Sequence, residues 1–147
     1  MDELLNSSIE DIVSIFNDEL NVMLNQLILI ANNLNMSNNE RTTIINSKNK
    51  LCNAINVNVN LCVELYAKFL LTEKFNGFFD NIKARNYKYF YELTEKEEID
   101  PQFRELMVLI RTVSYQVGDE TKNDVFGYVE NLSLLATIFA QKKIEKK

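Results

Sequence analysis

Apolar residues recur at intervals of three and four along most of the chain, and few residues interrupt this pattern. The 147 residues include three glycines and one proline, the two residue types that most often end or kink a helix. Ser7 or Ser8 can cap a first helix that closes within residues 32–35, and Ser37 begins a second capping box with Glu40. The pattern predicts an all-α fold.

The middle of the chain contains one stretch with a different period. Residues 55–61 alternate apolar and polar side chains, as a half-buried strand does, but a lone strand without a partner is not stable. We therefore expect a helix to break near Asn56 and a new helix to start with Asn58 as its cap. We expect Gly77 to end that helix, and residues 78–93 to form a short helix followed by an irregular loop.

Two further helices are predicted in the last third of the chain. Asp100 and Pro101 have the types preferred for a cap and a first helical residue, and Gly118 is expected to end the helix that they start. The last helix is expected to start within residues 119–121. Its lysine-rich end complements the helix dipole and is expected to fray at about residues 142–147.

The length of the chain fits one domain. A protein of 17.1 kDa buries roughly 70% of the surface that its unfolded chain exposes, which is enough for a core without disulfides. We find no linker and no internal repeat. We therefore expect a single antiparallel bundle over residues 1–147, with about five main helices, short helical segments and a frayed start at about residues 1–7.

The composition removes most catalytic constellations. The chain has no histidine, the residue most used for acid–base catalysis near neutral pH and the commonest metal ligand. Cys52 and Cys62 are too few for a thiolate zinc or iron–sulfur site, and we expect both to be reduced. The acidic run at residues 95–100 is typical of a solvated connector. We expect no enzyme activity, no catalytic residue, no metal site and no cofactor.

Charge and hydropathy also bear on partners and location. The net charge of −5 weighs against a general binder of phosphate backbones, because such binding is driven by cationic charge. No apolar run approaches the roughly 20 residues of a membrane span, and the acidic N-terminus lacks the positively charged start of a signal peptide. We expect an intracellular protein without a membrane span.

Aromatic and basic side chains are interleaved over residues 82–91, which we call the aromatic–basic segment. Such residues can anchor a protein partner, or they can stack bases and neutralise phosphates. Alternatively, Ile82, Tyr87 and Phe90 close one end of the bundle while the charges stay in water. The acidic net charge places protein ahead of nucleic acid as the partner. The candidate interaction residues are Lys83, Arg85, Tyr87, Lys88, Tyr89 and Phe90.

The first helix carries a wider apolar face than a surface helix requires. Beyond its main stripe it includes Ile15, Val22, Ile28 and Ile30. A helix of this kind is either central in the bundle or shares its excess face with a partner subunit. These four residues are therefore a candidate oligomer face.

Three stretches of the chain carry a resemblance to a group of proteins. They are the start around Ile12, Phe16 and Asn17, the segment from Lys83 to Tyr91, and residues 120–133. Together they resemble small all-helical proteins encoded by large nucleocytoplasmic DNA viruses, and the abundance of Asn, Ile and Lys is typical of an AT-rich coding sequence. The resemblance implies a viral protein in the host cytoplasm or the virion, and it supplies no catalytic residues.

Viral Bcl-2-like regulators are also all-helical, are of this size, and bind partner helices in a groove. The chain has no tryptophan and so lacks the Asn-Trp-Gly-Arg motif of the cellular members. We expect a non-enzymatic protein that works by protein–protein contact with itself, a viral protein or a host protein, either as a virion or assembly component or as a modulator of a host factor. The alternatives are a nucleic-acid-binding accessory protein that uses residues 82–91 and a Bcl-2-like helix-in-groove regulator.

Overall fold

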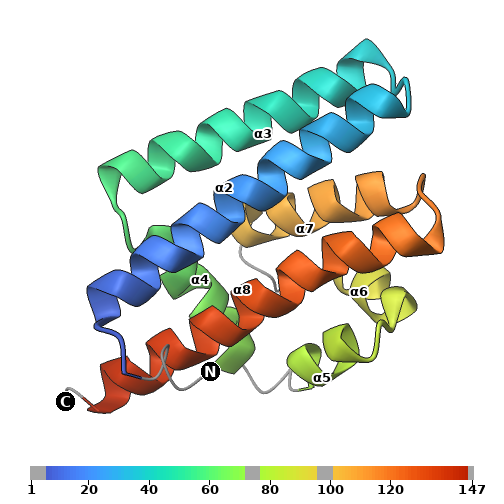
Figure 1. Ribbon diagram of the computed structural model, residues 1–147. Helices are drawn as coiled ribbons and strands as arrows, with labels where there is room; N and C mark the ends of the chain where they lie inside the picture. Colours follow the sequence, from blue (N-terminus) through green and yellow to red (C-terminus); the bar gives the residue numbers. More distant parts are fainter. Residues whose placement is uncertain (1–5, 72–76, 96–100, 146–147) are drawn as a thin grey trace.

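The computed structural model describes residues 6–71, 77–95 and 101–145 (Figure 1). These residues form helices joined by short turns, and they contain no strand, so the predicted all-α fold is confirmed. The helices are α2 (Ile9–Asn33), α3 (Asn38–Val57), α4 (Leu61–Leu71), α5 (Phe78–Lys83), α6 (Tyr87–Leu93), α7 (Pro101–Ser114) and α8 (Asp119–Glu145).

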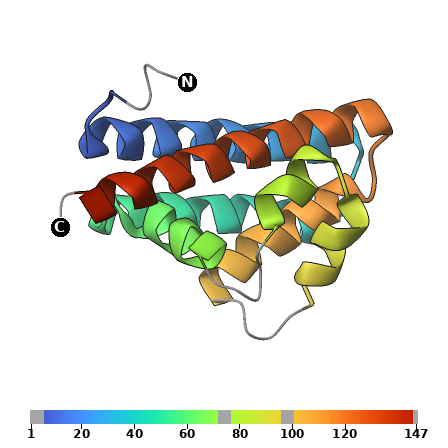
Figure 2. The same ribbon diagram turned by 90° about the horizontal axis from the view of Figure 1, so that it is seen from below.

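The two longest helices, α2 and α8, lie side by side and run antiparallel (Figures 1 and 2). Helix α3 turns back along α2, and α7 turns into α8, so both of these pairs are antiparallel too. The axes of α3 and α4 differ by 102°, which carries α4 beneath α2 and α8. The short helices α5 and α6 pack near the start of α8 (Figure 2).

Two predicted helix caps are present. The hydroxyl oxygen of Ser8 accepts a hydrogen bond from the Asp11 amide at 3.1 Å, and that of Ser37 accepts one from the Glu40 amide at 3.1 Å. Each bond satisfies one of the amide groups that have no partner within the first turn of a helix. These caps fix the starts of α2 and α3 where the sequence places them.

The break between α3 and α4 is confirmed, but the new helix starts later than expected. Helix α3 ends at Val57 and α4 begins at Leu61, so Val59 lies in the turn and is 53% exposed. The side chain of Asn58 accepts from the Asn60 amide at 3.1 Å, and the Val59 carbonyl accepts from the Asn17 amide group at 2.9 Å. These two bonds satisfy polar groups of the turn, so a helical conformation is not required there.

One expectation around residues 77–93 was wrong, and another falls beside residues that the structure does not describe. Gly77 precedes α5 as its N-cap, with a φ of 90° that favours glycine, and residues 72–76, where the preceding helix was expected to end, lie outside the described residues. The irregular loop expected after the first short helix is instead helix α6. Asn86 caps α6, because its side-chain oxygen accepts from the Tyr89 amide at 3.3 Å.

Helix α7 starts at Pro101 as expected but ends at Ser114, four residues before Gly118. The side-chain amide of Gln116 donates to the Thr112 carbonyl at 3.2 Å and so satisfies one of the last carbonyls of the helix. Helix α8 begins at Asp119, within the expected range. Asp100, the predicted cap of α7, lies outside the described residues.

The core is built from the apolar stripes of the long helices, with Phe16, Met23, Met107, Phe126 and Leu132 among its most buried side chains. A buried polar contact joins two of the helices: the Tyr66 hydroxyl of α4 lies 2.6 Å from the Ser133 hydroxyl of α8. No helix of the described residues is by itself long and apolar enough to cross a membrane, although the strongly bent pair of α3 and α4 reaches that length and composition when taken together.

Candidate functional site

The aromatic residues of the aromatic–basic segment pack into the bundle. Phe90 is 1% exposed, and its ring centroid lies 5.0 Å from that of Phe126 and 6.4 Å from that of Phe78. The ring of Tyr87 packs on Phe126 at 4.8 Å, and Tyr89 is half-buried beside Phe78. These rings cover the first half of α8 and hold α5 and α6 against it.

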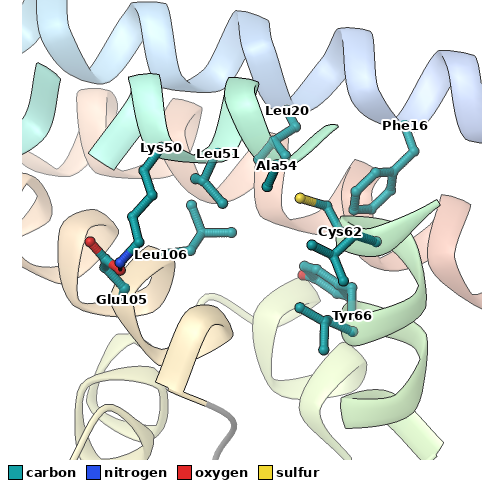
Figure 3. Close-up of a pocket in the computed structure, with 11 residues that line it drawn as sticks. Phe16, Leu20, Lys50, Leu51, Ala54, Cys62, Tyr66, Glu105 and Leu106 are labelled. Atoms are coloured by element: carbon teal, nitrogen blue, oxygen red, sulfur yellow. Dashed lines mark hydrogen bonds and ion pairs between the residues drawn. The ribbon is translucent and has the colours of Figure 1, made fainter. Parts of the chain in front are cut away.

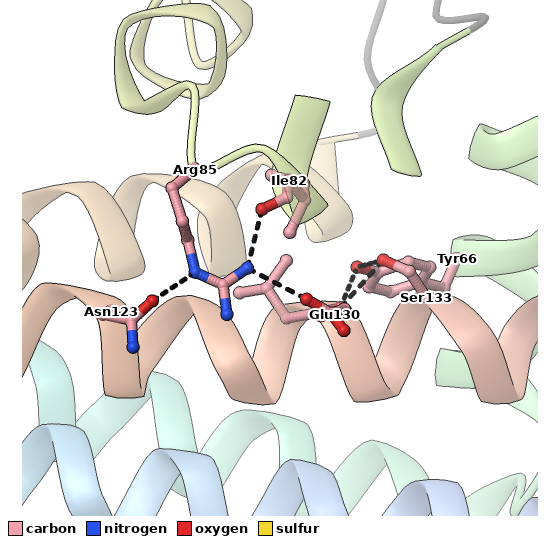
Figure 4. Close-up of polar contacts among 7 residues, drawn as sticks. Tyr66, Ile82, Arg85, Asn123, Glu130 and Ser133 are labelled. Carbon is pink, nitrogen blue, oxygen red and sulfur yellow. Dashed lines mark hydrogen bonds and ion pairs between the residues drawn. The ribbon is translucent and has the colours of Figure 1, made fainter. Parts of the chain in front are cut away.

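Arg85 ties the turn between α5 and α6 to α8 (Figure 4). Its Nε donates to the Asn123 side-chain oxygen at 2.6 Å, and its Nη1 donates to the Ile82 carbonyl at 2.7 Å and to a Glu130 carboxylate oxygen at 3.0 Å. Arg85 also has a positive φ of 58°, an uncommon conformation for a residue with a side chain. Its charge is therefore neutralised within the fold.

The two lysines of the segment are exposed and also have contacts within the chain. The Lys88 ammonium lies 3.9 Å from a Glu92 carboxylate oxygen, and the Lys83 ammonium lies 5.8 Å from the centroid of the Phe79 ring. A phosphate group would compete with these contacts at Lys83 and Lys88 and with the carboxylate of Glu130 at Arg85. The segment is in the first place a structural element.

A second aromatic contact lies between α6 and the end of α7. The rings of Tyr91 and Tyr115 are 4.3 Å apart, and the Arg111 guanidinium lies 5.3 Å from the centroid of the Tyr115 ring. Burial raises the pKa of Tyr91 above its ordinary value, and the neighbouring Tyr115 and Tyr87 raise it further, while Arg111 opposes them. Burial also raises the pKa of Tyr89.

Only the first member of the acidic run falls within the described residues. The Glu95 carboxylate lies 3.6 Å from Nη2 of Arg111, so it takes part in a contact between the end of α6 and α7. Across the described part of the chain, no group of three or more His, Cys, Asp or Glu side chains could hold a metal ion. Residues 96–100 lie outside the described residues.

The candidate oligomer face of α2 divides into two parts. Ile15 and Val22 are exposed by 38% and 44%, whereas Ile28 and Ile30 are half-buried and pack against the core. The sequence interpretation overlooked Leu29, which is 52% exposed. Ile15, Val22 and Leu29 repeat every seven residues, which is nearly two turns of an α-helix. We call these three residues the α2 face.

Helix α2, which carries the α2 face, lies between α3 and α8 (Figure 1). We call the line of the three side chains along this helix the ridge. On the α3 side, the Lys48 ammonium donates to the Asn25 side-chain oxygen at 2.6 Å. On the α8 side, the Asn131 amide group donates to a Glu19 carboxylate oxygen at 3.2 Å. Residues 20–39 contain no charged side chain, so the second half of α2 presents apolar and amide groups only.

A small apolar cavity lies between α2, α3, α4 and α7, with Lys50 and Glu105 on one side (Figure 3). Its volume is about 40 Å³, and a cavity of roughly 10–15 Å³ already holds one water molecule. Cys62 lines it, and burial, with a further effect of the neighbouring Cys52, raises the pKa of the Cys62 thiol to about 11. Both cysteines are free. The cavity has room for a few water-sized molecules and not for a cofactor.

A groove of about 660 Å³ separates the first half of α3 from α7, and we call it the α3–α7 groove. Side chains join the two helices near both ends. The Gln116 amide group donates to a Glu40 carboxylate oxygen at 3.3 Å, while Glu105 accepts from Ser47 at 3.3 Å and from Lys50 at 3.0 Å. Along α3, the stretch between the two bridges is about two helical turns.

The two threonines that line this groove use their hydroxyl groups within their own helices. The hydroxyls of Thr43 and Thr112 donate to carbonyls of their own helices, each at 2.8 Å. Their methyl groups are therefore the part of each side chain that is left for contact. Ile44 and Leu109 are buried at the groove, and Val108 is 40% exposed.

Comparisons with known proteins supply no identity. No family model matches the chain, and no curated protein or solved structure matches it. Of the features that the sequence interpretation missed, Leu29 could have been found by its spacing of seven residues from Val22. The groove and the cavity depend on how distant helices pack, and no local pattern announces them.

Proposed function

We propose that the protein acts by binding another protein chain and that the α2 face is its contact surface. The observation that carries the proposal is the repeat of exposed Ile15, Val22 and Leu29 at a spacing of seven residues on one helix. An apolar stripe with this spacing stays on one side of a helix over several turns and packs against a second helix.

The aromatic–basic segment supports this role less well than the α2 face does. Its aromatic rings are packed on Phe126 and Phe78, and its arginine is bonded to Asn123 and Glu130. A partner at the segment would have to use the exposed lysines alone or displace these contacts. The α2 face needs no such rearrangement, because its three side chains are already in water.

The resemblance found in the sequence gives this contact a biological setting. As a viral protein, the chain would work as a virion or assembly component or as a modulator of a host protein, in the host cytoplasm or the virion. Both roles require a persistent protein–protein surface and no catalytic group. The absence of histidine from the chain is in keeping with such a role.

The α3–α7 groove favours a second candidate function, the helix-in-groove binding expected of a Bcl-2-like regulator. Its occupant would be a short amphipathic helix that places apolar side chains over Ile44 and Leu109. The bridges at Glu40 and Glu105 limit the contact to about two turns of that helix.

One experiment tests both candidates. A photo-crosslinking amino acid is placed at the position of Leu29, of Val108 or of Leu71, which is 66% exposed on α4 and serves as the control. In cells that express the protein naturally, we expect the probe at Leu29 to join a protein chain and the control to join none. Crosslinks from Val108 alone would favour the groove. If neither probe exceeds the control at Leu71, the proposed function is wrong.

A further inference from the structure

The α2 face has a symmetry that specifies its partner. We propose that it binds the α2 face of a second copy of this chain, with the two helices antiparallel across a two-fold axis at Val22. The inference rests on the proposed function and names the partner. A closed two-fold dimer requires one surface patch that is complementary to itself, and the described residues of α2 provide such a patch.

The spacing of the three apolar residues is equal on both sides of the centre. Ile15 lies seven residues before Val22 and Leu29 lies seven residues after it. When two such helices run antiparallel, Val22 meets Val22 of the second copy and Ile15 meets Leu29 of the second copy. All three exposed apolar side chains of each copy are then covered, along about 21 Å of helix.

The charges of α2 favour the antiparallel arrangement over the parallel one. The acidic residues of α2, Glu10, Asp11, Asp18 and Glu19, all precede Val22, and no charged residue follows within the helix. A parallel pair would place each carboxylate at the level of the same carboxylate in the second copy. An antiparallel pair places the acidic half of one helix opposite the uncharged half of the other, which avoids this repulsion.

The antiparallel pair also brings opposite charges together. Asp18 lies on the α3 side of the ridge, four residues before Val22, and Asn25 lies on the same side, three residues after it. Two-fold symmetry therefore sets Asp18 opposite Asn25 of the second copy. The Lys48 ammonium is bonded to Asn25 at 2.6 Å, so Lys48 of the second copy lies beside Asp18. This ion pair favours one register of the two helices, and it makes the affinity of the dimer decrease with increasing salt concentration.

The neighbouring helices leave room for this contact. Helix α2 lies at the edge of the molecule in Figure 2, with α8 beside it and the other helices on its inner side. Its polar ties to α3 through Asn25 and to α8 through Glu19 run sideways from the ridge. A second copy that packs on this edge contacts Ile15, Val22 and Leu29 between these two ties. The contact is narrow, so we expect a reversible dimer of modest affinity.

Engineered disulfides test the arrangement. In a background that carries Cys52→Ser and Cys62→Ser, we prepare the single variants Ile15→Cys and Leu29→Cys. After mild oxidation, an antiparallel dimer gives a disulfide-linked dimer when the two variants are mixed and little when either is alone. In a parallel dimer each cysteine lies opposite the same cysteine of the second copy. Each variant alone then gives a disulfide-linked dimer, and mixing the two variants gives no additional one. The reverse result would overturn the proposed arrangement.

Charge reversal tests the same register without new cysteines. Sedimentation velocity of the intact protein is recorded from about 1 μM to about 1 mM, the range in which weak association is visible. We expect at least a tenfold weaker dimer for Asp18→Lys and for Lys48→Glu, and a recovery when both substitutions are combined. Asp124→Lys, on the exposed side of α8, is the control and leaves the dimer unchanged.

Val22→Lys places two positive charges at the centre of the contact and should abolish the dimer, whereas Leu71→Lys should not. Circular dichroism of each variant verifies that the fold is retained, as expected for side chains that are already exposed. A wild-type protein that stays monomeric at every concentration overturns the inference. The proposed function then still stands if the probe at Leu29 joins a different protein, and it fails with the inference if that probe joins nothing.

Discussion

The aromatic–basic segment and the α2 face differ in composition, and the fold uses them in opposite ways. The segment has the side chains that are most often found at binding sites, yet Phe90 is 1% exposed and Arg85 makes three hydrogen bonds within the chain. The α2 face consists of three aliphatic side chains of ordinary kind, and all three remain at least one-third exposed. The residue type determines which interactions a side chain can make. Its contacts within the fold determine whether it is available to bind a partner.

This difference has a physical origin in the length of the helices. Helices α5 and α6 have six and seven residues, too few to be stable without tertiary contacts. They are held on α8 by the rings and the guanidinium of the segment. Helix α2 has 25 residues and a core-facing stripe along its whole length. This stripe holds α2 in the fold, and the further apolar side chains on its outer side are not needed for packing within the chain.

The largest effect is expected from the aromatic core of the segment. Phe90→Ala removes a ring that is buried between Phe126 and Phe78, and such truncations destabilise a fold by about 3–5 kcal/mol. Urea denaturation followed by circular dichroism measures the change. A loss below about 1 kcal/mol would mean that the segment is not a structural element.

Arg85→Ala is expected to have an intermediate effect. It removes the bonds to Asn123, to the Ile82 carbonyl and to Glu130, at a site where the arginine side chain is 25% exposed. We expect a loss of about 1–2 kcal/mol in the free energy of unfolding. Lys88→Ala is the matched control, since that side chain is 87% exposed and its ion pair is long. Its effect should stay within about 0.5 kcal/mol. Equal effects of the two variants would contradict the role assigned to Arg85.

The ionisation of the segment's tyrosines gives a pH test. Burial raises the pKa of Tyr89 and of Tyr91, because the folded state favours the neutral phenol. The stability that this provides is complete below the ordinary tyrosine pKa of about 10 and is lost as the pH rises through the raised values. Ultraviolet titration should show part of the phenolate signal at higher pH in the folded protein than in urea.

Two variants assign that signal. Tyr91→Phe and Tyr89→Phe should each remove part of the high-pH component, while Tyr128→Phe serves as a comparison from outside the segment. If the phenolate signal of the folded protein rises in one step at the same pH as in urea, the tyrosines of the segment are not packed as described.

The smallest effect on stability is expected from the α2 face itself. Val22→Ser and Leu29→Ser remove apolar groups that are exposed by 44% and 52%. At protein concentrations below those at which the proposed dimer forms, each should change the free energy of unfolding by no more than about 0.5 kcal/mol. A much larger loss would show that these side chains belong to the core of the monomer and are not available to a partner.

Much of the fold could be predicted from the sequence, because it is encoded locally. The caps at Ser8 and Ser37, the break after Val57 and the start of the last helix at Asp119 each follow from a few neighbouring residues. The predicted helix boundaries are wrong where a contact between residues distant in the sequence determines the local conformation. The Asn17 side chain binds the turn at Val59, and the bonds of Arg85 to α8 hold the turn that separates α5 from α6.

The candidate site was predictable only in part, for the same reason. The width of the apolar face of α2 follows from its sequence, and Ile15 and Val22 are exposed as an oligomer face requires. The sequence could not separate them from Ile28 and Ile30, because burial of those two depends on the positions of the neighbouring helices. Three of the chain's 20 asparagines make contacts that no local pattern shows: Asn25 and Asn131 join α2 to the neighbouring helices, and Asn123 joins α8 to the turn between α5 and α6.

Hydroxyl-radical footprinting over a concentration series tests most directly which of the two regions is the contact surface. With increasing protein concentration, we expect protection of Ile15, Val22 and Leu29, while Tyr87 and Tyr89 keep the same reactivity. Protection of Tyr87 and Tyr89 with no change at the α2 face would show that the aromatic–basic segment, and not the α2 face, is the surface that contacts a partner.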